Sequence, residues 1–200
     1  MPPESIRPTG TTPSTLVCEL SRDLPESKTR EALSFAYSAS KIDANSIGWL
    51  PRQAYDTRHS SGELLILFNN ADLVAFILMS RPSSYQELRC LQIWVRPDAR
   101  IILHGHVILR KFEQLARDRG CITCRCWCAE DLPSNLFWAA MGWHKKTWRW
   151  GPARNARRHN LWLKHLTPYP VSPSPNGQQE TAALSHSTPT ILLPIAGWAG

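Results

Sequence analysis

The stretch that decides the fold is VRPDARIILHGH, which runs from Val95 to His106. An apolar run, Leu88–Val95, precedes it, and an amphipathic run, Val107–Ala116, follows it. This order predicts a strand, a short basic loop with a glycine, and then a helix. A helix N-terminus presents backbone N–H groups without intrahelical partners and the positive end of the helix dipole. The stretch therefore predicts a phosphate-binding turn.

The positive charge is concentrated in one part of the chain. Of the net charge of +7, residues 1–99 contribute −1 (10 Lys/Arg against 11 Asp/Glu). Residues 100–166 contribute +9 (13 against 4), and residues 167–200 contribute −1 through Glu180. Such a basic region favours an anionic partner, which could be a nucleotide cofactor, RNA or an acidic substrate.

The length of 200 residues suits one domain with a hydrophobic core. Residues 1–15 and 167–200 are rich in Pro, Ser and Thr without periodicity, which predicts disordered tails around a domain of residues 16–166. No apolar run approaches the roughly 20 residues that cross a bilayer, and residues 1–5 lack the layout of a signal peptide. We therefore expect a cytoplasmic protein without a membrane partner.

The hydrophobic periodicity predicts the element order α-α-β-β-β-α-β-α-β-β. This order indicates an α+β (mixed α/β) domain, in which a central mixed sheet of about six strands carries helices on both faces. The first two strands are apolar nearly throughout, so we expect both of their faces to be covered. The predicted strands are Glu63–Phe68, Leu73–Met79, Glu87–Val95, Ile122–Cys128, Trp143–Trp150 and His159–Leu166.

In this order the chain from about Leu16 to Leu166 resembles the GNAT N-acetyltransferase superfamily. The segment Ile93–Pro97 resembles the family's central strand with its Val-x-Pro ending, and Arg100–Gly105 resembles the Arg/Gln-x-x-Gly-x-Gly/Ala loop. Asp131–Trp143 resembles a later helix with its closing aromatic signature. The resemblance implies an N-acetyltransferase that uses acetyl-CoA as co-substrate, with direct attack by an amine acceptor.

The resemblance also implies a set of cofactor-binding residues. The central strand would pair with the pantetheine arm, the loop would bind the pyrophosphate, and a side chain of the later helix would contact the cofactor. Leu103 replaces the first loop glycine, and Trp138 stands where many members carry a Tyr that protonates the departing thiolate. The implied residues are Ile93, Trp94, Val95, Arg100, Leu103, His104, Gly105, His106, Asn135 and Trp138.

A general base is a further requirement, because the attacking amine must be neutral. Glu87 begins the central strand and is the candidate catalytic residue, and Glu63 begins a neighbouring strand. Either glutamate could equally be a solvated strand end. Gln92 could only position a water molecule.

The cysteines raise the question of a metal site. Cys124, Cys126 and Cys128 alternate along one predicted strand and follow Cys121. A zinc ion needs about four ligands that converge on one point, whereas alternating residues are spread along the strand. We therefore expect reduced, partly buried thiols and no metal.

Tryptophans interleave with basic residues in the second half of the chain. This pattern could be a hairpin with aromatic pairs and a charged rim, or a surface that holds single-stranded nucleic acid. The second reading supports an alternative function, a non-catalytic GNAT-like module that binds RNA or another anionic partner. The tryptophans are Trp127, Trp138, Trp143, Trp148, Trp150 and Trp162.

Overall fold

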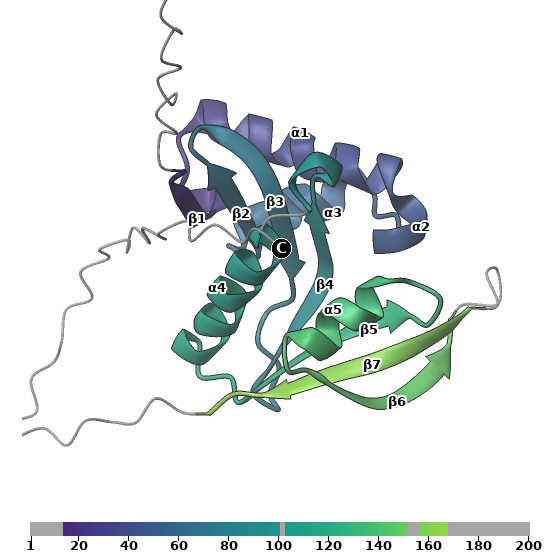
Figure 1. The fold of residues 1–200 in the computed structure, drawn as a ribbon. Coiled ribbons are helices and arrows are strands. Elements are labelled where there is room, and N and C mark those ends of the chain that lie inside the picture. Colours follow the sequence, from purple (N-terminus) through teal and green to yellow (C-terminus); the bar gives the residue numbers. More distant parts are fainter. Residues whose placement is uncertain (1–13, 101–102, 152–156, 168–200) are drawn as a thin grey trace, which may run out of the picture.

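The computed structural model describes residues 14–100, 103–151 and 157–167 (Figure 1). The strands are β1 (Leu16–Leu20), β2 (Leu64–Asn69), β3 (Asp72–Met79), β4 (Glu87–Val95), β5 (Thr123–Ala129), β6 (His144–Trp150) and β7 (Arg158–His165). The α-helices are α1 (Glu26–Ile42), α2 (Ala44–Ile47), α3 (Arg52–Ser60), α4 (His104–Asp118) and α5 (Ser134–Ala140). Short 3₁₀ turns cover Ser21–Asp23 and Pro97–Ala99. The predicted tails fall almost entirely outside the described ranges.

One mixed sheet runs through the domain in the order β1-β2-β3-β4-β5-β7-β6. Only β4 and β5 pair in parallel, and every other neighbouring pair is antiparallel. Helices lie on both faces of the sheet (Figure 1). The predicted α+β class is therefore confirmed.

Two hydrophobic clusters fill the space between the sheet and its helices. Leu64 of β2 packs in the cluster that contains Tyr55 of α3 and the alanines of α1. Its neighbour Leu65 packs in the cluster that contains Phe112 of α4. Successive strand side chains point to opposite faces, and both of these leucines are fully buried. The expectation that both faces of this part of the sheet are covered is confirmed.

Strand β1 makes the sheet seven strands wide, where about six were predicted. It pairs with β2 at the edge of the sheet, and all five of its residues are only half-buried. An edge strand buries little surface, so its sequence needs little apolar periodicity. Cys18 and Glu19 interrupt the pattern further.

Helix α4 begins at His104, one turn earlier than the apolar periodicity of Val107–Ala116 indicates. His and Gly are poor helix formers, so the sequence signal starts later than the helix does. The earlier start places Gly105 inside the first turn of the helix. No helix in the described ranges is long and apolar enough to cross a membrane.

Candidate active site

The candidate site lies where β4 and β5 separate. Their parallel ladder covers only Glu87–Cys90 on β4 and Thr123–Cys126 on β5. Beyond this point β4 continues to Val95 beside β3 alone, while β5 continues beside β7. The sheet therefore opens into a V between two strands, and the β5-facing edge of Leu91–Val95 has no strand partner among the described residues.

A β-bulge in β4 coincides with the point of separation. Met79 of β3 faces Cys90, but the preceding Leu78 faces Gln92, so Leu91 is an extra residue. The bulge shifts the alternation of side chains. Cys90 packs on the α4 side, whereas Gln92 and Trp94 point to the α1 and α3 side. The separated half of the strand thus presents different side chains to each layer than a regular strand would.

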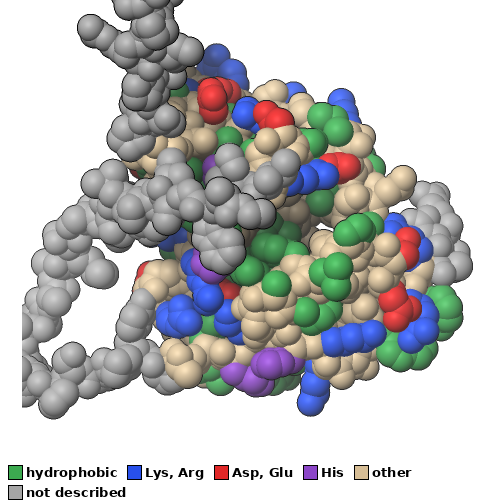
Figure 2. All heavy atoms as spheres, viewed as in Figure 1, with side chains coloured by type: hydrophobic (Ala, Val, Ile, Leu, Met, Phe, Trp, Pro, Cys, Tyr) green, Lys and Arg blue, Asp and Glu red, His purple; other side chains and the backbone are tan. Residues whose placement is uncertain are grey.

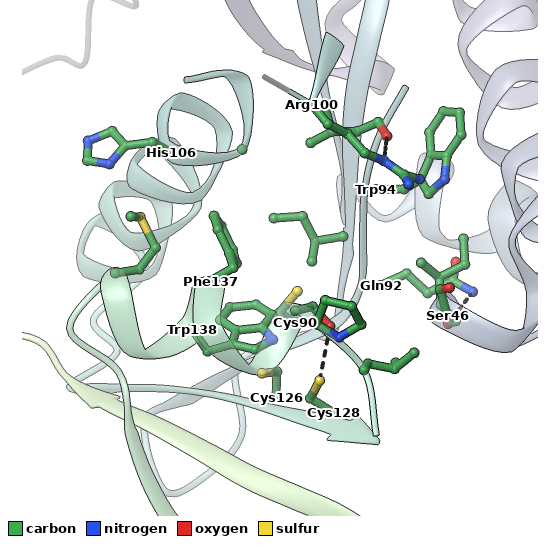
Figure 3. A pocket seen from close by; sticks show the side chains of 18 of the residues that line it. Ser46, Cys90, Gln92, Trp94, Arg100, His106, Cys126, Cys128, Phe137 and Trp138 are labelled. Atoms are coloured by element: carbon green, nitrogen blue, oxygen red, sulfur yellow. Dashed lines mark hydrogen bonds between the residues drawn. The ribbon is translucent and has the colours of Figure 1, made fainter. Parts of the chain in front are cut away.

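A cavity of about 560 Å³ fills the V. Phe137 and Trp138 point from α5 toward β4, with Cys126 and Cys128 near Trp138, and Ser46 of α2 lies on the other side (Figure 3). Hydrophobic side chains gather where α4 and α5 face each other (Figure 2). Residues from both layers line the cavity, so it crosses the sheet. The remaining lining residues are Ile47, Cys90, Leu91, Gln92, Ile93, Trp94, Val95, Arg100, Leu103, Gly105, His106, Trp127, Leu132, Pro133, Ser134 and Met141.

The N-terminus of α4 borders this cavity. Leu103 is the N-cap, with φ −57° and ψ 18°, and its side chain makes no capping hydrogen bond. The first intrahelical bond joins the Val107 N–H to the Leu103 carbonyl at 2.9 Å. The N–H groups of residues 104–106 therefore have no intrahelical acceptor, as the sequence predicts for a phosphate-binding turn.

Gly105 allows this helix end to approach its neighbours closely. A Cβ at this position would lie 3.2 Å from Cε2 of Phe137 and 3.6 Å from Cγ2 of Val95. The glycine is thus needed for packing between α4, α5 and β4. Its backbone is not in the left-handed region, so no unusual φ requires it.

Arg100 fastens the end of β4 to α1. Its Nε donates to the Val95 carbonyl at 3.0 Å, and its Nη2 donates to Oδ2 of Asp43 at 2.5 Å. The indole N–H of Trp94 donates to the same carboxylate oxygen at 2.6 Å. The hydrogen bond from Trp94 and the Arg100 guanidinium lower the pKa of Asp43. Three predicted cofactor residues therefore share one hydrogen-bonded network at the rim of the cavity.

The structure does not bring His104 or Asn135 to the cavity surface. His104 is buried, and its Nδ1 lies 3.0 Å from the Ala99 carbonyl. Asn135 donates to the carbonyls of Ala129 and Leu132 at 2.8 Å, and its Oδ1 accepts from Trp162. Both side chains are occupied in holding the loops that form the walls of the cavity.

Glu87, the predicted base, lies at the closed end of the V and does not line the cavity. Its Oε2 is 3.2 Å from Nε of Arg125, and both side chains are largely buried. Glu63 is also remote, because it is buried between Arg58 and Arg81. Their positions leave both carboxylates without access to a substrate in the cavity.

Thiols and an indole form the inner end of the cavity. The ring centres of Trp138 and Trp143 lie 4.7 Å apart, with the rings tilted by 54° to each other, and Sγ of Cys128 lies 3.2 Å from Oγ of Ser134. Burial raises the pKa of Cys128 and that of Cys90, so both thiols are neutral at physiological pH. All six cysteines are free. No group of three potential metal ligands occurs within the described ranges.

Sequence reasoning missed the part of the site that α2 contributes. Buried Gln92 accepts from the Tyr55 hydroxyl at 2.7 Å and donates to the carbonyls of Ile47 and Gly48 at 3.2 and 2.7 Å. It thus positions α2, whose Ser46 and Ile47 line the cavity. A buried glutamine within an apolar strand was the only sequence signal for this role.

The comparisons with known proteins concern the fold. No family model and no curated protein matches the sequence, but solved structures do. The ribosomal-protein-S18-alanine N-acetyltransferase from Escherichia coli is 14% identical with a TM-score of 0.59, covering 78% of this chain and 97% of that one. An aminoglycoside 6'-N-acetyltransferase complexed with coenzyme A is 13% identical with a TM-score of 0.62, covering 77% and 99%.

A third structure is a putative acetyltransferase of the GNAT family from Desulfovibrio desulfuricans. It is 12% identical with a TM-score of 0.58, and the match covers 77% of this chain and 99% of that one. Identities this low carry information about the fold alone. On this evidence the chain has the fold of the GNAT acetyltransferases.

Proposed function

We propose that the protein is an N-acetyltransferase that transfers the acetyl group of acetyl-CoA to an amine. The observation that carries this proposal is the open edge of β4, which lies beside the uncapped N-terminus of α4 in one cavity. An extended amide-containing chain pairs with an open strand edge, and a pyrophosphate binds a helix N-terminus. Acetyl-CoA carries both groups. The similar aminoglycoside enzyme was solved with coenzyme A.

Different residues that line the cavity would bind different parts of the cofactor. The N–H groups of Gly105 and His106 would bind the pyrophosphate, and Ile93 and Val95 would face the pantetheine arm. Leu103 is 67% exposed, so its side chain stands in solvent beside the helix end and does not fill the cavity. The bulk of Leu103 limits the approach of a phosphate to this backbone, which weakens binding without preventing it.

The chemistry follows from the two-sided cavity. The β5-facing edge of Leu91–Val95, which has no strand partner among the described residues, would offer backbone N–H groups that polarise the thioester carbonyl. A neutral amine adds to this carbon, and the tetrahedral intermediate releases the CoA thiolate and leaves an amide. The amine's proton passes to water. Cys128 and its neighbour Ser134 would donate hydrogen bonds to the departing thiolate, which then takes its proton from water, because burial raises the pKa of the Cys128 thiol and keeps it protonated.

The alternative, a non-catalytic RNA-binding module, has less support. Trp138, Trp143 and Trp162 are buried in the hydrophobic core, so only part of the tryptophan pattern is exposed. Trp148 and Trp150 are the exposed members of that pattern. Their hairpin remains a basic surface, which the enzyme hypothesis can assign to substrate recognition.

Two matched substitutions on α5 test the proposal. Ser134→Trp places an indole in the cavity, whereas Leu136→Trp adds the same group at a position that is 78% exposed and outside the cavity. At 100 times its Kd, acetyl-CoA stabilises a protein by about 2.7 kcal/mol, which is a Tm increase of roughly 5–10 °C here. We expect this increase in the wild type and Leu136→Trp and its loss in Ser134→Trp. No increase in the wild type at millimolar acetyl-CoA would refute the proposal.

A further inference from the structure

The acceptor side of the cavity carries a cationic aromatic surface. Because α4 and α5 border the side assigned to acetyl-CoA, the amine must approach from the α2 side, which Ser46, Ile47 and Trp127 line. Trp127 points to the face of β5 opposite Cys126, since strand side chains alternate. The indole therefore forms a wall of the opening through which an acceptor enters.

Arg149 packs on the indole of this wall and does not itself line the cavity. Its guanidinium carbon is 4.1 Å from the centre of the Trp127 ring, although the two residues belong to β6 and β5. The side chain is exposed, and the described part of the chain supplies no carboxylate that pairs with it. A guanidinium that contacts the face of an indole through its central carbon can still present N–H groups to a bidentate carboxylate. This geometry favours an acceptor with an acidic group near its amine.

Arg157 makes the same opening rigid. It donates to the Asn45 carbonyl at 2.8 Å and to Oδ1 of Asp131 at 2.7 Å. These bonds join the start of β7 to the residue before Ser46 and to the loop that precedes α5. These contacts hold the α2 segment and the loop before α5 together beside Trp127, where both border the opening.

The carboxylates around the opening are already paired with cations. Asp43 binds Arg100, Asp131 binds Arg157, and Glu130 lies 3.5 Å from Lys145. Hydrogen bonds from Trp94 and Arg157 lower the pKa of Asp43 and of Asp131, respectively. Such carboxylates are weak bases toward an alkylammonium ion. An amine that is already neutral when it binds should therefore react faster than one that must first lose a proton in the site.

The pKa of the amine then decides between acceptor classes. A peptide α-amino group has a pKa of about 7.7–8.0, whereas a lysine side chain has one of about 10.4. At pH 7.5 the neutral fraction is roughly 0.3 for the former and roughly 0.001 for the latter. The greater nucleophilicity of the lysine amine offsets part of this difference in neutral fraction. A preference of at least about 10-fold for the α-amino group remains.

On these grounds we infer that the acceptor is the α-amino group of a peptide chain with an acidic side chain in its first residues, bound by Arg149 on Trp127. The inference rests on the acetyltransferase function proposed above and specifies its substrate class. The guanidinium binds the acidic side chain, and the fixed opening directs the α-amine toward the bulge of β4.

Three short synthetic peptides test the inference with the full-length protein and acetyl-CoA at pH 7.5. The first has a free N-terminus followed by two glutamates, and the second has two lysines in their place. The third has a blocked N-terminus and one internal lysine. Thiol release gives kcat/KM, and mass spectrometry gives the acetylated position. We expect the first peptide to exceed each of the others by at least about 10-fold, with acetylation at its α-amine.

Two variants assign the preference to the proposed surface. Arg149→Ala should lower kcat/KM for the acidic peptide about 10-fold through KM, while Lys146→Ala, which removes an exposed charge of the same strand, should leave it unchanged. Equal or better use of the blocked lysine peptide, or no effect of Arg149→Ala, would overturn the inference and leave the acetyltransferase function standing. Absence of both acetyl-CoA binding and transfer to any amine would overturn both.

Discussion

The two halves of β4 differ in what borders them. From Glu87 to Cys90 the strand has β3 on one edge and β5 on the other, whereas from Leu91 to Val95 it has β3 alone. In the first half, Glu87 is paired with Arg125. In the second half, side chains and open backbone face a cavity of about 560 Å³.

This difference shows that pairing of β4 with β5, more than residue type, decides whether a position in β4 is structural or functional. Glu87 has the chemistry of a base, but its place in the paired half gives it an ionic partner instead of a substrate. Gln92 has no acid–base chemistry, but its place in the open half makes it an organiser of the cavity wall.

The largest expected effect concerns Gln92 in the open half. Gln92→Leu leaves the buried Tyr55 hydroxyl and two carbonyls of the α2 segment without their partner. We expect the free energy of unfolding to fall by about 2–3 kcal/mol and acetyl transfer to decrease, as measured by urea denaturation and thiol release. Tyr55→Phe removes only one of these bonds and should cost about 1 kcal/mol. Equal stability of Gln92→Leu and the wild type would contradict the assigned role.

A smaller effect is expected in the paired half. Glu87→Gln should reduce the free energy of unfolding by about 1 kcal/mol, because it weakens a largely buried ion pair. The value of kcat/KM and its pH profile should stay within about twofold of the wild type, because Glu87 does not line the cavity. A loss of more than tenfold in kcat, with a changed pH profile, would show that Glu87 is the base. The paired half of β4 would then not be purely structural.

Leu103 tests how the helix end beside the open half binds its ligand. Leu103→Gly removes a side chain next to the first N–H groups of α4, which have no acceptor within the helix, and should lower the Kd of acetyl-CoA about threefold. The backbone at this position is accessible to any residue, so glycine should also cost about 0.5–1 kcal/mol of stability. Calorimetric titration measures the affinity, and Leu103→Ala serves as the intermediate case. An unchanged Kd would show that the turn does not contact the ligand.

The smallest effect concerns His106 at the same helix end. Burial and the nearby Arg110 lower the pKa of His106 from its usual 6.5, so the folded protein disfavours the charged imidazole. Stability should therefore fall as the pH drops below about 6.5, since the unfolded chain then binds more protons. A bound pyrophosphate raises this pKa, so CoA should bind about threefold more tightly at pH 5.5 than at pH 7.5.

His106→Asn should remove this pH dependence of the Kd while keeping a neutral hydrogen-bonding side chain. Titrations with CoA at the two pH values check the outcome. The same pH dependence in the variant and the wild type would assign the effect to another group and remove His106 from the phosphate site.

Much of the fold could be predicted, because its signals are local. The apolar runs of β2 and β3 require cover on both faces, and the amphipathic pattern of α4 requires a core beside it. The edge strand β1 could not be found, because an exposed strand needs little apolar pattern. The order of elements was then enough to indicate the GNAT fold.

The site was predictable only where function depends on the backbone. The turn from Val95 to His106 was found because strand, glycine and helix follow one another in sequence. The surroundings of Asn135 and Glu87 were not predictable, because their partners Trp162 and Arg125 become neighbours only through folding. The burial of His104 was missed although its partner Ala99 lies only five residues earlier. The separation of β4 from β5 leaves no mark in the sequence of either strand.

The bulge at Leu91 also decides which side chains of β4 reach each face of the site. If Leu91 were instead paired with β3 in a regular ladder, the two faces would be exchanged for every position between it and Pro97. Gln92 and Trp94 would then point into the apolar layer under α4, and the network through Tyr55 and Asp43 would be lost. Changes of chain length are tolerable in the loop between β3 and β4, but a residue added or removed between Gln92 and Val95 would turn the side chains that follow it to the wrong face of the strand.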